Sequence, residues 1–154
     1  MFMNEYRHTI DAKGRMILPA RFREELGTRF VLSRGIDQCL TIYPMEHWQT
    51  LTTSLQKLSF TKSSVRKLRR FLIGSSTEME CDRQGRILIP AHLREYAGLK
   101  KEALVIGTGA TIEIWNPAVL DAANGDDESI ADLAESLDIP MVRFLWNLNI
   151  RQYC

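Results

Sequence analysis

The sequence predicts a mainly β fold with helices (α+β), built from two β-β-α-β-β modules. Two observations carry this prediction: residues 11–24 align with residues 82–95 without a gap, and glycine and proline punctuate both copies alike. A third observation is that 45% of the 154 residues are hydrophobic, which is enough for a packed core. The chain is therefore expected to fold and not to be a disordered segment.

The internal repeat is the most informative feature of the chain. Asp, Gly, Arg, Pro, Ala, Arg and Glu stand at the same places in both aligned segments, and three aliphatic or Met residues lie between the Arg and the Pro. Beyond a one-residue insertion, we align residues 31–43 with residues 103–115. The duplication then covers a module of about 45 residues.

Local rules predict the same order of elements in each copy. A local hairpin of two strands comes first, then a helix that follows a proline and ends at a glycine, then two strands joined by a turn with Gly35 and Asp37. In the first copy these elements are predicted at 5–10, 15–18, 20–26, 30–33 and 40–43, and the helix of the second copy at 91–97. Such a small module buries too little apolar area to stand alone, so the two copies should pack on each other.

The pattern divides the chain into four parts. They are module 1 at 5–47, a helical linker at 48–73, module 2 at 76–119, and a C-terminal helical region and tail at 120–154. In and around the linker, apolar residues at helical spacing predict helices at 44–59 and 64–72. Further helices are predicted to start at Pro117 and, as an acidic helix, at Ser129, and the apolar tail 139–154 is predicted to dock as a helix on its own or a neighbouring subunit.

The net charge of +1 is the sum of two unlike regions. Six basic residues lie between positions 57 and 70 without an acid, and seven acidic residues lie between 121 and 138 without a base. Such asymmetry can place a positive potential on one face of a nearly neutral molecule. The basic helix at 66–70 faces DNA or the acidic helix of a neighbouring subunit, and the sequence leaves both options open.

Catalysis, metal binding and membrane insertion find little support in the sequence. The three cysteines are far apart, the three histidines show no ligand spacing, and no nucleophile has an evident base. No apolar run approaches the roughly 20 residues of a membrane span, and no signal peptide opens the chain. We therefore expect that the protein is not an enzyme and that it binds no cofactor, metal or membrane. We expect it in the cytoplasm.

A short motif, Asp-x-x-Gly-Arg, gives the repeat a chemical meaning. Its Asp can cap the turn by accepting backbone N–H groups, its Gly supplies the positive φ of a short loop, and its Arg can grip guanine O6 and N7 in the major groove. We expect the arginine at a protruding hairpin tip. The motif comprises Asp11, Gly14 and Arg15 in the first copy and Asp82, Gly85 and Arg86 in the second.

Further polar residues near the motif are candidates for DNA contact. Arg7, Lys13, Arg83 and Gln84 are predicted to touch DNA, and the nearby Arg21, Arg23, His92 and Arg94 could also meet phosphates. The alternative is that each motif arginine merely pairs with the aspartate of its own turn. An exposed pair of that kind contributes only about 0–1 kcal/mol to stability, which leaves the identical spacing in both copies unexplained.

The paired motifs, each followed by an aliphatic-Pro-Ala segment and a short helix, resemble the SpoVT-AbrB DNA-binding module. Two such modules separated by a helical linker resemble the MraZ family of transcriptional regulators, over about residues 1–138. The resemblance implies a swapped-hairpin β-barrel formed within one chain, closed homo-oligomeric rings, and a place at the nucleoid. It also implies DNA contact by Arg15 and Arg86 and recognition, as a repressor, of tandem short G-rich promoter repeats upstream of the division and cell-wall gene cluster.

A second class of function is also consistent with the sequence. Related swapped-hairpin proteins include antitoxins, which bind DNA and also neutralise a toxin through a disordered C-terminal extension. The C-terminal part of this chain is largely helix-patterned, which favours the regulator.

Overall fold

The computed structural model of the chain describes residues 1–125 and 129–137. It divides into two units, Met1–Asp121 and the residues from Ala122 onward. The helix predicted in the tail at 139–154 lies outside the described residues. The module boundaries 5–47, 48–73, 76–119 and 120–154 remain a prediction.

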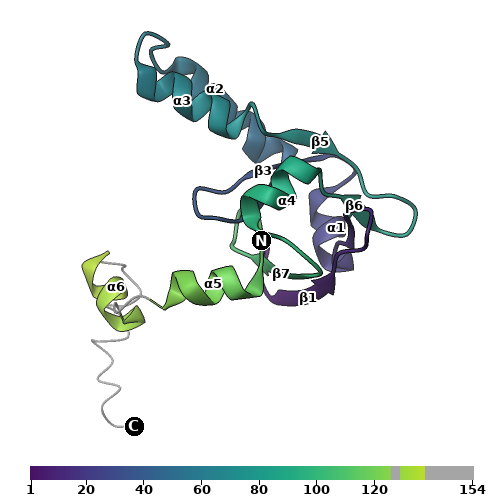
Figure 1. Cartoon of the computed structure of the whole chain (residues 1–154). Coiled ribbons are helices and arrows are strands. Elements are labelled where there is room, and N and C mark those ends of the chain that lie inside the picture. Colours follow the sequence, from purple (N-terminus) through teal and green to yellow (C-terminus); the bar gives the residue numbers. More distant parts are fainter. Residues whose placement is uncertain (126–128, 138–154) are drawn as a thin grey trace. The chain divides into compact units, whose positions relative to one another are not determined.

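The elements follow the predicted order in each repeat (Figure 1). The first repeat contains β1 (Glu5–Thr9), β2 (Arg15–Ile17), α1 (Ala20–Leu26), β3 (Phe30–Arg34) and β4 (Leu40–Pro44). Two helices link the repeats, α2 (Met45–Lys57) and α3 (Ser63–Leu72). The second repeat contains β5 (Thr77–Met79), β6 (Arg86–Leu88), α4 (Ala91–Ala97), β7 (Glu102–Gly107) and β8 (Ile112–Trp115), and α5 (Pro117–Asn124) and α6 (Ile130–Ser136) follow it.

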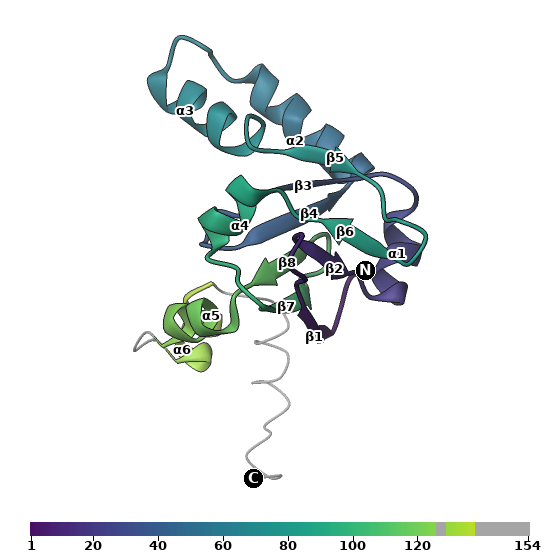
Figure 2. The same cartoon turned by 45° about the vertical axis from the view of Figure 1, so that its right-hand side comes forward.

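The strands of the two repeats interleave. One antiparallel sheet has the order β1-β7-β8-β4-β3-β5, and a second sheet contains only β2 and β6 (Figure 2). The first strand of each repeat thus pairs with the third strand of the other, and the two second strands pair together. The predicted α+β fold with a swapped-hairpin arrangement inside one chain is confirmed.

The prediction that residues 5–10 and 15–18 pair along their length as a local hairpin is wrong. The two strands share a single bridge, Ile10 with Met16, and the Asp11 N–H donates to the Arg15 carbonyl at 2.9 Å. Beyond that bridge β1 and β2 diverge into different sheets, because the other repeat supplies a full partner strand to each of them.

The registers relate the two repeats by a local two-fold symmetry. In the small sheet Met16 lies opposite Ile87, with Arg15 opposite Leu88 and Ile17 opposite Arg86. In the large sheet β4 and β8 pair symmetrically about Thr41 and Glu113.

The same registers correct part of the sequence alignment. Arg7 pairs with Leu104, and the equivalent of Arg7 in the second repeat, Glu78, pairs with Val31. Val31 therefore corresponds to Leu104 and not to Ala103. One more residue is inserted before β7 than the sequence alignment assumed. The shift is hard to recognise in the sequence because the apolar runs of β3 and β7 are similar.

A single hydrophobic core joins the repeats. Side chains on or directly after β2, on α1, and at the equivalent places of β6 and α4 are at most 1% exposed: Met16, Leu18, Phe22, Ile87, Ile89 and Leu93. Because these residues meet in one cluster, neither repeat has a core of its own. The packing of two small modules on each other, expected from their size, is what the structure contains.

Arginines hold the two linker helices together and attach α3 to strand β3. The Arg69 side chain donates to the carbonyls of Leu55 at 2.9 Å and Leu58 at 3.1 Å, which closes the C-terminal end of α2. The Arg34 guanidinium on β3 lies 5.4 Å from the ring centroids of both Phe71 and Tyr96. Helix α2 ends two residues earlier than predicted, at Lys57, because the backbone is extended at Leu58, whose carbonyl accepts the Arg69 hydrogen bond.

The C-terminal helices begin where the sequence placed them. Helix α5 starts at Pro117, and the Ser129 side chain caps α6 by accepting the Asp132 N–H at 3.1 Å. Over the described ranges 1–125 and 129–137, no helix combines the length and apolarity that a bilayer span requires.

The interleaved topology predicts that one repeat cannot fold as a monomer. A fragment of residues 1–73 lacks β6, β7 and β8, so β1 and β2 have no partners and half of the core is missing. We expect it to be unfolded when dilute and to fold as a homodimer, with a melting midpoint that rises with concentration. Circular dichroism and sedimentation measure both properties.

The matched control is an equimolar mixture with residues 74–124, which should restore β-structure at concentrations where neither fragment folds alone. A fragment 1–73 that melts cooperatively as a monomer would contradict this reading of the topology.

Candidate nucleic-acid interface

The two Asp-x-x-Gly-Arg turns form the same hydrogen bonds. In the first turn, Asp11 Oδ1 accepts the N–H groups of Lys13 and Arg15, each at 2.9 Å, and Asp11 Oδ2 accepts Arg15 Nε at 2.7 Å. In the second turn Asp82 accepts the N–H groups of Gln84 and Arg86 at 2.9 Å and Arg86 Nε at 2.8 Å. Each aspartate therefore caps its turn and holds one edge of the following guanidinium.

The carboxylates are charged over the whole physiological pH range. The backbone N–H of Arg15 lowers the pKa of Asp11, and the Arg15 side chain and the Lys13 N–H lower it further. The pKa of Asp82 is lowered in the same way, first by the backbone N–H of Arg86. The ion pairs within the turns are therefore formed at neutral pH.

The turn glycines connect the two repeats. Gly14 and Gly85 have φ values of +86° and +76°, a region that side chains disfavour. The Gly14 carbonyl accepts the Ile89 N–H and the Gly85 carbonyl accepts the Leu18 N–H, both at 2.9 Å. These bonds extend the β2–β6 pairing at both ends and fix each turn against the other repeat.

Two arginines that the sequence offered as phosphate contacts have a different place in the structure. Arg23 and Arg94 are half-buried, and their Nε atoms donate to the carbonyls of Leu18 and Ile89 at 3.0 Å. Each guanidinium lies under the turn glycine of the other repeat: a Cβ on Gly14 would stand 2.8 Å from Arg94 Cζ, and a Cβ on Gly85 would clash with Arg23. These arginines position the turns, a role that only the swapped topology reveals.

The expectation that the motif arginines stand at the hairpin tips is wrong. Arg15 and Arg86 open strands β2 and β6, with side chains 32% and 28% exposed. Their Nε atoms engage the aspartates, and within the described residues no hydrogen bond engages their terminal nitrogens. The arginines therefore stand on the paired strands, behind the turns, while the exposed tips carry Ala12, Lys13, Arg83 and Gln84.

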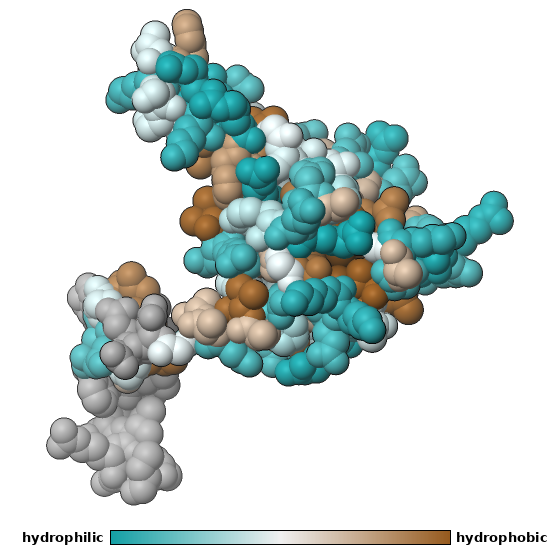
Figure 3. Space-filling model, viewed as in Figure 1, coloured by the Kyte–Doolittle hydropathy of each residue, from teal (hydrophilic) through white to brown (hydrophobic). Residues whose placement is uncertain are grey.

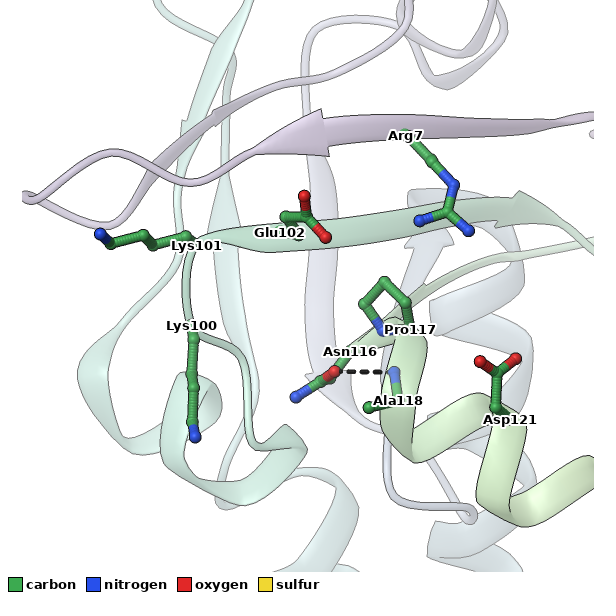
Figure 4. Close-up of a pocket in the computed structure, with 8 residues that line it drawn as sticks. All are labelled: Arg7, Lys100, Lys101, Glu102, Asn116, Pro117, Ala118 and Asp121. Atoms are coloured by element: carbon green, nitrogen blue, oxygen red, sulfur yellow. Dashed lines mark hydrogen bonds between the residues drawn. The ribbon is translucent and has the colours of Figure 1, made fainter.

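The structure does not bring Arg7 to the two turns. It lies on β1 beside a hollow of about 670 Å³ whose lining includes Lys100, Lys101, Glu102 and Asp121 (Figure 4). No residue of either motif lines this hollow. Arg7 therefore belongs to a separate surface, next to two lysines that the sequence analysis did not single out.

In the view of Figure 3, side chains over the turn before β6 and along the α2–α3 hairpin are mostly hydrophilic, with a few hydrophobic ones on the hairpin. Part of the basic run on α3 is used internally: Arg66 donates to the Phe60 and Thr61 carbonyls at 2.9 Å, and Arg69 closes α2. Lys67 and Arg70 on this helix, and Lys62 directly before it, remain exposed.

The remaining titratable groups show no catalytic arrangement in the described part of the chain. Burial raises the pKa of the Cys39 thiol to about 12, so it is not a nucleophile at neutral pH. His92 Nε2 lies 3.1 Å from the Ser75 carbonyl, and no three His, Cys, Asp or Glu residues of this part gather as metal ligands.

The swapped strands and paired turns define a two-module protein of the SpoVT-AbrB type. The family described as "MraZ protein, putative antitoxin-like" matches residues 1–71 and 72–124. The chain therefore belongs to the MraZ family.

Curated relatives carry the name "Transcriptional regulator MraZ". The protein of Desulfitobacterium hafniense (strain Y51) is 49% identical over 138 residues, which cover 89% of this chain and 96% of the relative. That of Thermoanaerobacter sp. (strain X514) is 48% identical over 139 residues, covering 90% and 97%. That of Moorella thermoacetica is 54% identical over 116 residues, covering 75% and 81%.

The contact between Gly14 and Arg94 predicts that alanine destabilises the protein more at position 14 than at a glycine without such a contact. Gly14→Ala should lower the free energy of unfolding by about 2–4 kcal/mol, because it adds backbone strain and brings the new Cβ to 2.8 Å from Arg94 Cζ and 3.0 Å from the Ile89 carbonyl oxygen, to which Arg94 is hydrogen-bonded. The matched control is Gly98→Ala, at φ +63° with no atom closer than 3.8 Å to the new Cβ, which should cost only about 1 kcal/mol. Urea denaturation measures both losses, and equal losses would mean that Arg94 does not support the turn.

Proposed function

We propose that the chain is a sequence-specific DNA-binding transcriptional regulator that acts by binding and has no catalytic role. It recognises tandem short G-rich promoter repeats upstream of the division and cell-wall gene cluster and represses transcription there, in the cytoplasm at the nucleoid. The observation that carries the proposal is the pair of identical turns, each of which holds an arginine by its Nε atom.

This geometry suits the recognition of guanine. The Asp11 carboxylate fixes the Arg15 guanidinium at Nε, so its terminal nitrogens are left to donate to O6 and N7 in the major groove. A side chain already held in place loses less conformational entropy on binding. Arg86 has the same support from Asp82, so one chain presents two equivalent readers.

The exposed tips provide the surrounding contacts in this proposal. Lys13, Arg83 and Gln84 stand on the turns that precede the two arginines and meet phosphates or base edges. Arg7 lies on a separate surface with Lys100 and Lys101 and would contact the backbone of DNA that runs beyond the ribbon.

Replacing the motif arginines by lysine separates base reading from charge. Arg15→Lys and Arg86→Lys should each weaken binding to the preferred duplex by about 1–3 kcal/mol and reduce discrimination, because lysine keeps the charge and loses the fork. Fluorescence anisotropy would compare two duplexes at several salt concentrations. One is the DNA upstream of the chain's own gene, and the other is a scrambled version of it.

The matched controls are Lys13→Ala and Arg7→Ala, which should weaken binding to both duplexes alike. Each should also lower the salt slope by about one for every phosphate that the protein no longer neutralises. If Arg15→Lys with Arg86→Lys kept full discrimination, the arginines would serve only the turns and this proposal would fail.

We further propose that several chains assemble into a closed ring that engages the tandem repeats together. Edge strands β1 and β5 and the exposed Leu58 and Phe60, 47% and 69% exposed, are surfaces that assembly would cover. Light scattering at micromolar concentration should give a mass of several chains. If only monomers are found, the proposed ring is contradicted, and so is the simultaneous binding of tandem repeats.

The family description favours a second candidate, an antitoxin-like protein that neutralises a partner toxin. Binding to the chain's own upstream DNA, with the tandem repeats intact or deleted, tests the regulator directly. Repeat-dependent binding supports the regulator. Binding that ignores the repeats, combined with a toxin gene beside this one, would support the antitoxin.

A further inference from the structure

The small β2–β6 sheet has an unusual outer face. Its inner residues Met16 and Ile87 are at most 1% exposed, whereas the outer Ile17 and Leu88 are 48% and 58% exposed. Residues two apart on a strand share a face, so these two aliphatic side chains lie on the same side as Arg15 and Arg86. Both repeats thus keep a large apolar residue in water, two positions after the motif arginine.

The register places each aliphatic residue beside an arginine of the other repeat. Leu88 lies directly opposite Arg15, and Ile17 lies directly opposite Arg86. Directly opposite side chains are about 5 Å apart at Cβ, and the two arginines, as diagonal neighbours, are about 7–8 Å apart. The four side chains form a compact block in which an arginine and an aliphatic group alternate around the local two-fold axis.

A block of this kind matches the floor of the DNA major groove. The groove admits a two-stranded β-ribbon, and the only apolar group that its bases expose there is the C5-methyl of thymine. Arginine side chains on the same face supply the charge complementarity that a ribbon entering the groove requires. A lone exposed leucine or isoleucine would need no explanation, but a symmetric pair between two arginines does.

We propose that Ile17 and Leu88 are specificity-determining residues that contact thymine methyl groups next to the guanines bound by Arg86 and Arg15. The inference rests on the proposed function and deepens it. Each reading unit is composite, an arginine from one repeat with an aliphatic residue from the other. The ribbon therefore prefers a site in which each half contains a guanine and a neighbouring thymine.

Deoxyuridine provides the direct test, because it differs from thymidine only by the missing methyl group. The full chain would first select duplexes from a randomised library, and each thymine of the preferred duplex would then be replaced in turn by deoxyuridine. At the thymines beside the essential guanines we expect affinity to fall about fourfold per methyl group, the value for one buried methyl-sized group. Other thymines should be insensitive.

The variants Ile17→Ala and Leu88→Ala complete a double-substitution cycle. For each variant, replacing the thymine that the lost side chain would contact by uracil should leave the affinity unchanged. Each variant should also keep the melting temperature and oligomeric mass of the parent chain. The matched control is Ile36→Ala, a 76% exposed aliphatic residue in the β3–β4 turn, which should keep the fourfold uracil effect.

The outcomes separate the two proposals. A preferred duplex whose binding is unchanged by uracil would overturn this inference and leave the proposed function intact. A change in oligomeric mass for Ile17→Ala or Leu88→Ala would also overturn it, because the pair would then be a subunit contact. A library that yields no preferred duplex would overturn the proposed function itself, and this inference with it.

Discussion

The pairing of β2 with β6 is the constraint on which the rest of the structure depends. Three residues from each repeat meet in antiparallel register about Met16 and Ile87, and the turn glycine of each repeat accepts a hydrogen bond from the strand end of the other. Neither repeat can build this ribbon alone. The core beneath it, the orientation of both turns and the spacing of the two motif arginines all follow from one two-fold contact.

Electrostatics and sterics act together within each turn. The aspartate satisfies two backbone N–H groups and one edge of the guanidinium, and the glycine lets an arginine from the other repeat lie directly beneath the turn. A rigid turn of this kind fixes the direction of Arg15 or Arg86 before any partner arrives. Pre-organisation of that sort improves affinity chiefly by lowering the entropy lost on binding.

The basic residues fall into two groups that have different roles. Arg23, Arg94, Arg34 and Arg69 lie against carbonyls, aromatic rings or glycine, and they hold elements together. Exposed basic residues at the turn tips and on α3, among them Lys13, Arg83 and Lys67, extend into solvent, where their charge is free to attract an anionic partner. A count of cations in the sequence merges these groups, because both have the same side-chain chemistry.

The sequence by itself determined the duplication, the order of the elements, the helix starts at Pro117 and Ser129, and the turn chemistry of Asp11 and Gly14. Comparison of the two segments is enough to find the duplication, and the other features follow from interactions between residues close in the chain, which spacing and residue type disclose. Tertiary structure alone decided that β1 and β2 separate into different sheets, that Arg94 lies beneath Gly14, and that Ile17 faces the solvent opposite Arg86. Those features depend on which strand of the other repeat lies alongside, and pairing between segments about 70 residues apart leaves no local pattern in the chain.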